Sequence, residues 1–374
     1  MTLVPKLIAL DLPASPQLRS EVEVAWERGD VVLPLDQRMM PAARRRLALL
    51  FGAELLVSTA GRETMRPDAM PMCEPLVAGD AVVIATSGST GQPKGVIHTH
   101  ASLNAHADMV GERLGLDSNT HWWLCLPAAH IGGFGVITRS MRFGSTLSFN
   151  EHPDAASIQA ALRDGATHTA MVPTLVARHP LDGWRAILVG GAASGPLPDN
   201  AVSTYGLTET CGGVVYDGDP LSGVEVSLAN GEIRLKSPSM ARSYRHGPLT
   251  VDQGWLVTGD LGRIENGVLR VDGRKDDLII TGGNKVWPYV VEQRLREHPL
   301  VQDVVVRGVP DPEWGSIVCA YVVPIGASVA PSLESLRGHV KETLGSYCAP
   351  RKVVFVNAIP RNALGKPLLN ELAT

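Results

Sequence analysis

Short apolar runs alternate with helix-length segments through the first two-thirds of this 374-residue chain. The apolar runs are 81–86, 121–127, 145–149, 167–172 and 185–190. Segments of helical composition, such as 99–114 and 154–163, lie between them. Strands separated by helices favour an α/β fold, because a parallel strand needs a crossover connection to reach its neighbour. The sequence therefore predicts a large N-terminal α/β domain with mainly parallel sheets.

The pattern changes near residue 220. Short strands split by Gly, Asn and Asp turns in 223–237 and 254–273 predict antiparallel hairpins or a small barrel-like region. Further on, the pattern predicts a small α+β domain with helices at 288–297 and 332–344 and strands at 301–309, 317–323 and 352–356. A chain of this length exceeds what one core usually organises. We place the boundary at the polar stretch Lys275–Asp277, which gives an N-terminal domain at 1–275 and a mobile C-terminal domain at 276–374.

Composition excludes several classes of protein. A hydrophobic fraction of 44%, a charged fraction of 19% and a net charge of −4 are typical of a globular protein and argue against a nucleic-acid partner. Prolines and charges break the apolar N-terminus, so we expect neither a signal peptide nor a membrane span. The five scattered cysteines form no C-x-x-C pair, which predicts a reducing, cytoplasmic location and argues against disulfides and a zinc site. The cysteines are Cys73, Cys125, Cys211, Cys319 and Cys348.

The loop TSGSTGQPKGV, residues 86–96, follows a predicted strand. Such a loop offers backbone N–H groups and hydroxyls to phosphate oxygens, and Lys94 adds a positive charge. It is not a Walker A loop, because Pro93 precedes the lysine and Gly95 follows it. The segment 189–195 also lacks the dinucleotide-binding glycine spacing. A plain flexible turn is the alternative, but the loop has more small polar residues than a linker needs.

The loop and four later segments resemble the signature motifs of the adenylate-forming superfamily, which includes acyl- and aryl-CoA ligases, peptide-synthetase adenylation domains and luciferases. The later segments are 205–210, 255–263, 273–292 and 359–372, in family order. The resemblance implies that a carboxylate attacks the α-phosphate of ATP in the presence of Mg²⁺, after which a thiol such as CoA displaces AMP. Positioning and charge neutralisation dominate such phosphate chemistry.

The resemblance also implies roles for individual residues. The expected ATP-binding residues are Thr86, Ser87, Gly88, Ser89, Thr90 and Lys94 at the phosphates, Gly191, Ala192 and Tyr205 at the adenine, and Asp260 and Arg274 at the ribose. The expected catalytic residues are Lys366, Thr208 and Glu209, with Glu209 also holding Mg²⁺. Asp276 matches the hinge position, and Gly282 and Gly283 leave room for the pantetheine arm of CoA. A tight strand-to-loop turn at Gly190 and Gly191 and a solvated loop acid at Glu209 are the structural alternatives.

The segment 126–141 resembles the o-succinylbenzoate–CoA ligases of menaquinone biosynthesis, with His130 and Arg139 at their His and Arg positions. The resemblance implies that both residues bind the acid substrate, with His130 lining the acyl pocket. The early start of the phosphate loop resembles the compact members of that family. The expected acid is a dicarboxylate, so its second carboxylate needs a cation such as Arg139. Alternatively, Arg139 caps a helix or meets a surface acid, and His130 is a core histidine. For His98, His100 and His106 we expect ordinary polar roles, not metal binding.

The sequence therefore predicts an ATP-dependent o-succinylbenzoate–CoA ligase. Its partners would be an aryl carboxylic acid, ATP and CoA, and we expect a homodimer. The alternatives are a ligase for another aryl or short-chain acid, an adenylation enzyme that loads a separate carrier protein, and a nucleotide-binding protein without catalysis. Two departures loosen the acid assignment but touch no ATP-binding group. Ser243 stands where the family usually has glycine before Tyr244, and the spacing from Gly191 to Tyr205 is short.

Overall fold

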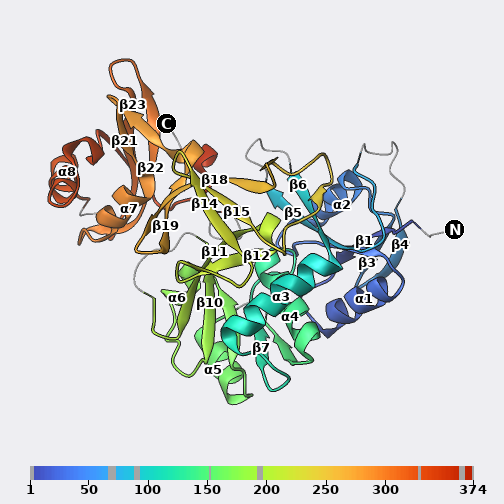
Figure 1. Cartoon of the computed structure of the whole chain (residues 1–374). Coiled ribbons are helices and arrows are strands. Elements are labelled where there is room, and N and C mark those ends of the chain that lie inside the picture. Colours follow the sequence, from blue (N-terminus) through green and yellow to red (C-terminus); the bar gives the residue numbers. More distant parts are fainter. Residues whose placement is uncertain are drawn as a thin grey trace. The chain divides into compact units, whose positions relative to one another are not determined.

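The computed structural model describes residues 4–65, 73–87, 93–150, 153–191, 197–326, 330–361 and 367–372 (Figure 1). The chain divides into two units. The first comprises 1–227 with 234–257, and the second comprises 228–233 with 258–374. The predicted boundary at Lys275–Asp277 lies within the second unit, in a short 3-10 turn. A hinge for domain rotation at that turn stays a prediction.

A seven-stranded mixed sheet with the order β16-β6-β5-β2-β1-β3-β4 forms half of the first unit. Its strands are β1 (Leu7–Asp11), β2 (Val31–Pro34), β3 (Leu55–Ser58), β4 (Gly61–Thr64), β5 (Asp80–Ser87), β6 (Pro93–Thr99) and β16 (Ser243–Tyr244). The central strands pair in parallel and the edge strands antiparallel. The same part of the chain contains helices α1 (Pro16–Glu27) and α2 (Pro41–Leu50). Ala48 of α2 and Phe51 directly after it pack in the core with Leu33, Val83 and Ile97 of the sheet. Continuous apolar runs form the central strands β1, β2 and β5, because both sheet faces are buried there.

A second seven-stranded sheet has the order β13-β12-β11-β10-β9-β7-β8. Its strands are β7 (His121–Leu124), β8 (Thr146–Phe149), β9 (His168–Met171), β10 (Ala186–Gly190), β11 (Ala201–Leu207), β12 (Gly212–Tyr216) and β13 (Asp219–Pro220). Strands β7 to β11 pair in parallel, and β12 and β13 pair antiparallel. The predicted α/β class is confirmed, with both sheets mixed rather than purely parallel.

Four helices pack on the second sheet or between the two sheets. They are α3 (His100–Leu114), α4 (Ile131–Phe143), α5 (Ala155–Arg163) and α6 (Pro173–Val176). Helix α4 packs on β7, β9 and β12, and α3 packs on α4 and β6, so α3 and α4 lie between the sheets (Figure 1). Thr99 begins α3 with a capping box to Ser102, and Gly115 ends it with a φ of 64°. The loops that follow the carboxyl ends of β5, β7, β10 and β11 carry the predicted motifs.

A five-stranded sheet follows, with the order β14-β15-β18-β17 and β19 paired to β18. Its strands are β14 (Glu225–Ala229), β15 (Glu232–Lys236), β17 (Val251–Asp252), β18 (Trp255–Glu265) and β19 (Val268–Arg274). The pairings of β17 and β19 with β18 are antiparallel, as the Gly, Asn and Asp turns predict. This strand order does not by itself establish a closed barrel, so the barrel-like region stays a prediction.

The C-terminal part of the second unit is a small α+β fold, as predicted. Its sheet has the order β21-β20-β23-β22, with β24 paired to β23. The elements are β20 (Ile279–Thr281), β21 (Asn284–Val286), α7 (Pro288–Arg296), β22 (Val301–Asp311), β23 (Gly315–Pro324), α8 (Leu333–Lys341) and β24 (Lys352–Phe355). One face packs on α7 and α8 through Val291, Leu295, Leu336 and Val340. Among the described helices of the whole chain, none is long and apolar enough to cross a membrane.

Candidate active site

The β5–β6 hairpin brackets the predicted phosphate loop. Thr86 and Lys94 are cross-strand partners, and the Thr86 hydroxyl donates to the Lys94 carbonyl at 3.4 Å. Ser87 ends β5. Gly88, Ser89 and Thr90 lie outside the described residues. The hairpin thus presents the two ends of the loop side by side, which suits a loop whose N–H groups converge on one anion.

The predicted Mg²⁺ ligand lies in a tight turn after β11. The 3-10 turn Thr208–Thr210 carries Glu209 and ends at Cys211, whose φ of 63° is rare for a residue other than glycine or asparagine. Donors from other segments hold its carbonyls. The Ala241 N–H donates to the Glu209 carbonyl at 2.8 Å, and the Ser239 hydroxyl donates to the Thr210 carbonyl at 2.9 Å. These bonds compensate for the strained backbone and fix the turn.

Two buried histidines bond to the backbone here, one to the same turn and one to strand β12 directly after it. His98 Nε2 donates to the Thr208 carbonyl at 2.7 Å, and His106 Nε2 donates to the Gly213 carbonyl at 2.9 Å. Burial lowers the pKa of His98 to about 4 and that of His106 to about 3. Both imidazoles are therefore neutral near pH 7 and act as N–H donors, which agrees with the polar roles predicted for them.

Glu209, Tyr244 and Lys94 form a cluster in the first unit. The Tyr244 hydroxyl donates to Glu209 Oε1 at 2.7 Å, and Lys94 Nζ lies 5.0 Å from the centre of the Tyr244 ring. Burial and the neighbouring Glu209 carboxylate both raise the pKa of Tyr244, so the phenol keeps its proton and remains a donor. The structure thus brings together a predicted phosphate-binding lysine and the predicted metal-binding carboxylate through a tyrosine.

The predicted adenine-binding residues lie on neighbouring parallel strands. Gly190 of β10 is opposite Thr204 of β11, so Gly191 and Tyr205 come next at the carboxyl ends of these two strands. Gly191 has a φ of 98°, in the region that favours glycine, so a strand-to-loop turn requires this residue whatever it binds. Ala192 lies outside the described residues. Carboxyl ends of parallel strands are where α/β proteins bind ligands.

The two predicted ribose-binding residues are in contact within the second unit. Asp260 of β18 faces Arg274 of β19, and Arg274 Nη1 donates to Asp260 Oδ1 and to the Thr258 carbonyl, each at 3.0 Å. Gly259 has a φ of 72°, and a Cβ there would lie 3.1 Å from Arg274 Nη2. The ion pair orients a buried carboxylate that can accept two hydrogen bonds from a diol.

His130 and Arg139 lie well apart on α4, His130 before its first residue and Arg139 in its C-terminal half. His130 is the N-cap residue, and nine residues at 1.5 Å rise separate the two by roughly 13 Å along the axis. His130 Nε2 is 3.0 Å from both Asp36 Oδ2 and Arg38 Nη2. Burial alone would raise the pKa of Asp36, but hydrogen bonds from Arg38 and His130 outweigh it and hold that pKa well below its usual range. His130 thus belongs to a partly exposed charged cluster and is not a core histidine.

Arg139 is a buried cation. It is 3% exposed, its guanidinium lies 4.7 Å from the centre of the Trp122 ring, and its Nε has no hydrogen-bond partner in the part of the chain that the structure describes. No carboxylate of the described ranges pairs with it. Burial lowers its pKa, since desolvation disfavours the charged form. In the described part of the chain, neither helix capping nor an ion pair with a surface acid therefore explains why this arginine is buried.

The remaining predicted site residues belong to the second unit. Asp276 lies in the 3-10 turn Lys275–Asp277. Gly282 and Gly283 form the β20–β21 turn with φ values of 53° and 79°, as in tight hairpin turns. A Cβ on Gly282 would lie 2.7 Å from the Trp314 ring, so local packing already requires glycine there. Lys366 lies outside the described residues.

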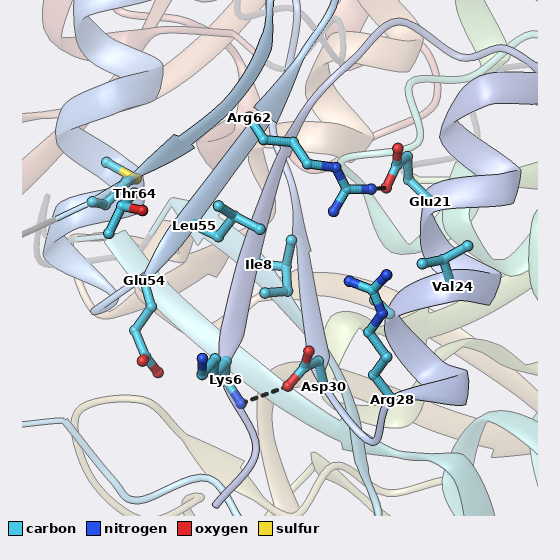
Figure 2. A pocket seen from close by; sticks show the side chains of 12 residues that line it. Lys6, Ile8, Glu21, Val24, Arg28, Asp30, Glu54, Leu55, Arg62 and Thr64 are labelled. Carbon is cyan, nitrogen blue, oxygen red and sulfur yellow. Dashed lines mark hydrogen bonds and ion pairs between the residues drawn. The ribbon is translucent and has the colours of Figure 1, made fainter.

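A charged cavity of about 280 Å³ lies elsewhere in the first unit, between α1 and strands β1, β3 and β4 (Figure 2). None of the predicted site residues lines it. Its polar groups are partly paired already, since Arg62 forms an ion pair with Glu21 at 2.5 Å and the backbone N–H of Lys6 donates to the Asp30 carboxylate at 3.0 Å. This cavity is separate from the motif residues.

Sequence reasoning missed the residues that hold the motif side chains in place. The motifs identified Lys94 and Glu209 but not Tyr244, because its partner Glu209 is 35 positions earlier in the chain. The alternation along VIHTH places His98 on the same strand face as Val96 and Lys94. That alternation is the one signal in the sequence that could have linked His98 to the site.

Comparison with known proteins agrees with this geometry. A Mycobacterium tuberculosis protein named probable 2-succinylbenzoate–CoA ligase is 37% identical over 358 residues, which cover 88% of this chain and 92% of that protein. The 2-succinylbenzoate–CoA ligase of Bacillus licheniformis is 31% identical over 337 residues, 78% of this chain and 69% of that protein. The Bacillus subtilis o-succinylbenzoate CoA synthetase (MenE) in complex with the acyl-adenylate intermediate OSB-AMP superposes with a TM-score of 0.86 at 26% identity, covering 100% of this chain and 89% of that chain.

Family models match both parts of the sequence. The AMP-binding enzyme model covers residues 49–248, and the AMP-binding enzyme C-terminal domain model covers 290–366. The first match includes the phosphate loop and the Glu209 turn, and the second ends at Lys366. Together with the similarity to the Mycobacterium tuberculosis protein along most of both chains, these matches show that the chain belongs to the AMP-binding enzyme family.

Proposed function

We propose that this protein is an ATP-dependent acyl-CoA ligase that adenylates o-succinylbenzoate and transfers the acyl group to CoA, with release of AMP and pyrophosphate. The similarity to the Mycobacterium tuberculosis ligase, which extends over 92% of that protein, carries the proposal. The geometry of the first unit supports it independently, because a lysine, a carboxylate and a strand-loop-strand hairpin converge where phosphates would bind.

In the adenylation step, a carboxylate of the acid attacks the α-phosphorus of ATP, and the bond to the β-phosphate oxygen breaks as pyrophosphate leaves. Lys94, Thr86 and the following loop residues Ser87, Gly88, Ser89 and Thr90 hold the leaving phosphates. Thr208 donates its hydroxyl to the α-phosphate. Donors aimed at the developing charge lower the barrier without reorganisation. CoA thiolate then attacks the acyl carbonyl, and AMP leaves.

Mg²⁺ fits the Glu209 site by its chemistry. Magnesium prefers one or two carboxylate oxygens together with phosphate oxygens. Tyr244 occupies only Oε1 of Glu209, and a carboxylate has a second oxygen for a metal. When bound, the ion neutralises charge on the ATP phosphates. The Bacillus subtilis MenE, at 26% identity, has been solved in complex with ATP and a magnesium ion.

The second unit contributes further groups in this proposal. The paired Asp260 and Arg274 bind the ribose hydroxyls, Gly191, Ala192 and Tyr205 of the first unit bind adenine, and Lys366 neutralises charge on the attacked α-phosphate. Rotation about Asp276 exchanges Lys366 for the turn at Gly282 and Gly283 before thioester formation.

The five cysteines are free thiols, which supports a cytoplasmic location. A homodimer stays a prediction.

Arg139 is our candidate for the second carboxylate of the acid. A buried guanidinium that no described carboxylate neutralises is costly, and an anionic substrate group would compensate for it. Arg38 is the other cation to consider, because it lies beside His130, the proposed acyl-pocket residue. The two candidates make different predictions for substitution.

The test is pyrophosphate release from protein, ATP and Mg²⁺ with o-succinylbenzoate or monocarboxylic aryl acids, with and without CoA. We expect the fastest release with o-succinylbenzoate and a CoA thioester as the product. Release only with another acid, or only with a carrier protein as acceptor, would reject this substrate assignment.

R139L should abolish the preference for the dicarboxylate and leave monocarboxylates as substrates. R142L is the matched control, since Arg142 is on the same helix but pairs with Asp108 at the surface. If R38L abolishes the preference and R139L does not, the second carboxylate binds at Arg38.

A further inference from the structure

We propose that Tyr244 is a positioning residue that orients Glu209 for Mg²⁺ and seats Lys94 for the phosphates of ATP. The inference rests on the proposed function, since it takes Glu209 and Lys94 as the groups that receive Mg²⁺ and ATP. Tyr244 touches both side chains, one with its hydroxyl and one with its ring face. None of the sequence motifs assigns it a role.

The position of Tyr244 follows from strand pairing. Strand β16 adds to the edge of the first sheet, with Tyr244 opposite Val96 of β6. Lys94 is two residues before Val96 and therefore shares its strand face, which makes Lys94 a diagonal neighbour of the tyrosine ring. Diagonal neighbours are within reach of aromatic and long side chains, in agreement with the 5.0 Å from Lys94 Nζ to the ring centre.

The backbone around Tyr244 is firmly held. The Tyr244 N–H donates to the Gly247 carbonyl at 3.0 Å, and the Arg245 N–H donates to the Gly95 carbonyl at 2.7 Å. The buried Arg245 guanidinium donates twice to the Phe51 carbonyl, at 3.1 and 2.7 Å. A Cβ on Gly95 would lie 2.9 Å from Arg245, so β6 and β16 approach closely. The ring is therefore anchored before any ligand arrives.

The hydrogen bond to Glu209 limits how its carboxylate can turn. The phenol donates to Oε1, and among the described residues no hydrogen bond to Oε2 competes with a metal ion for that oxygen. A neutral donor of this kind fixes the orientation of a metal ligand, as outer-shell partners commonly do. The ring face attracts the Lys94 ammonium without neutralising it, so the lysine keeps its full charge for phosphate.

The experiment compares Y244F with Y244L. Y244F removes the hydroxyl and keeps the ring, so we expect the Mg²⁺ concentration for half-maximal pyrophosphate release to rise about tenfold, with little change in the ATP requirement at saturating Mg²⁺. Y244L also removes the ring and should in addition raise the KM for ATP severalfold. Y347F is the matched control, because Tyr347 is an exposed tyrosine of the second unit, and its Mg²⁺ dependence should equal that of the wild type.

A double-mutant cycle distinguishes positioning from a general structural effect. If Tyr244 acts through Glu209, Y244F should change the Mg²⁺ dependence severalfold in the wild type but not in the E209Q background. A loss of stability alone would move the thermal midpoint and leave the Mg²⁺ dependence unchanged. Wild-type Mg²⁺ dependence in Y244F, or equal effects in both backgrounds, would overturn the inference.

Mg²⁺-dependent binding of ATP, measured without any acid, separates this inference from the proposed function. If the wild type binds ATP with Mg²⁺ but releases no pyrophosphate with o-succinylbenzoate, the proposed substrate is wrong, and the binding shift in Y244F still decides the role of Tyr244. If binding in Y244F retains the wild-type dependence on Mg²⁺, Tyr244 does not position Glu209.

Discussion

Acid should destabilise this protein through its two fully buried histidines. His98 and His106 are 0% and 2% exposed and are both held as neutral donors to backbone carbonyls. Their pKa values, about 4 and about 3, lie below the ordinary 6.5. Below pH 6.5 the unfolded chain therefore binds protons that the folded chain does not. Stability from this source is fully present above pH 6.5 and falls as the pH drops through 6.5 toward 4.

The size of the effect follows from the pKa differences. Each pH unit below 6.5 costs about 1.4 kcal/mol per histidine while the folded form remains unprotonated. At pH 5, 1.5 units below 6.5, each histidine has cost on the order of 2 kcal/mol, and the two together about 4 kcal/mol. This is a large fraction of the stability of a typical domain.

Urea unfolding of the wild type and H98Q at pH 7 and pH 5, followed by tryptophan fluorescence, measures the effect. Glutamine offers an N–H for the Thr208 carbonyl but does not titrate, so H98Q should lose about 2 kcal/mol less than the wild type between the two pH values. H179Q, which changes a partly exposed histidine, is the control and should lose as much as the wild type. If H98Q and the wild type lose equal stability, a neutral buried His98 is not the cause.

Three further substitutions test other parts of the structure. D80N should lower the free energy of unfolding by about 3 kcal/mol, because the fully buried Asp80 carboxylate accepts two hydrogen bonds from Arg242; urea unfolding measures this, and a loss below about 1 kcal/mol would contradict it. G282A should cost about 1–3 kcal/mol, because alanine is strained at a φ of 53° and its Cβ would clash with Trp314; a thermal midpoint equal to that of the wild type would exclude this packing. K366A should lower the rate of pyrophosphate release at least a hundredfold with ATP binding retained; an unchanged rate would remove Lys366 from the mechanism.

Local patterns predicted helices α3, α5, α7 and α8 and many of the strands, but they did not identify α1, α6 or, within the site, α4. The segment 131–143 contains Gly132, Gly133 and Gly135, which lower helix propensity. Tertiary packing requires at least one of them, because a Cβ on Gly133 would lie 2.3 Å from the Pro127 carbonyl oxygen. Packing against β7, β9 and β12 outweighs the weak propensity of the segment. A helix of this kind cannot be found from its own sequence.

The candidate site shows the same division between local and long-range information. Lys94 and Glu209 stand in recognisable motifs, and Asp260 and Arg274 could be paired because one hairpin connects their strands. The bonds that join Glu209 to Tyr244 and Thr208 to His98 span 35 and 110 positions. Such bonds depend on how β16 and the β11–β12 turn meet β6, which no spacing in the sequence specifies.

Strand β6 explains why these long-range contacts converge. Residues 94, 96 and 98 alternate onto one face, where Lys94 meets Tyr244 and His98 holds the turn that carries Glu209. The opposite face carries Ile97, which packs in the core with Phe51 and Val83. Gly95 is on that face too, since a Cβ there would also meet Phe51 and Val83. A slip of one residue in the pairing of β6 with β5 would place Ile97 at the turn and the charged Lys94 in the core. Burial of Ile97 therefore fixes the register of β6, and that register in turn sets where Lys94 and His98 meet the Glu209 turn.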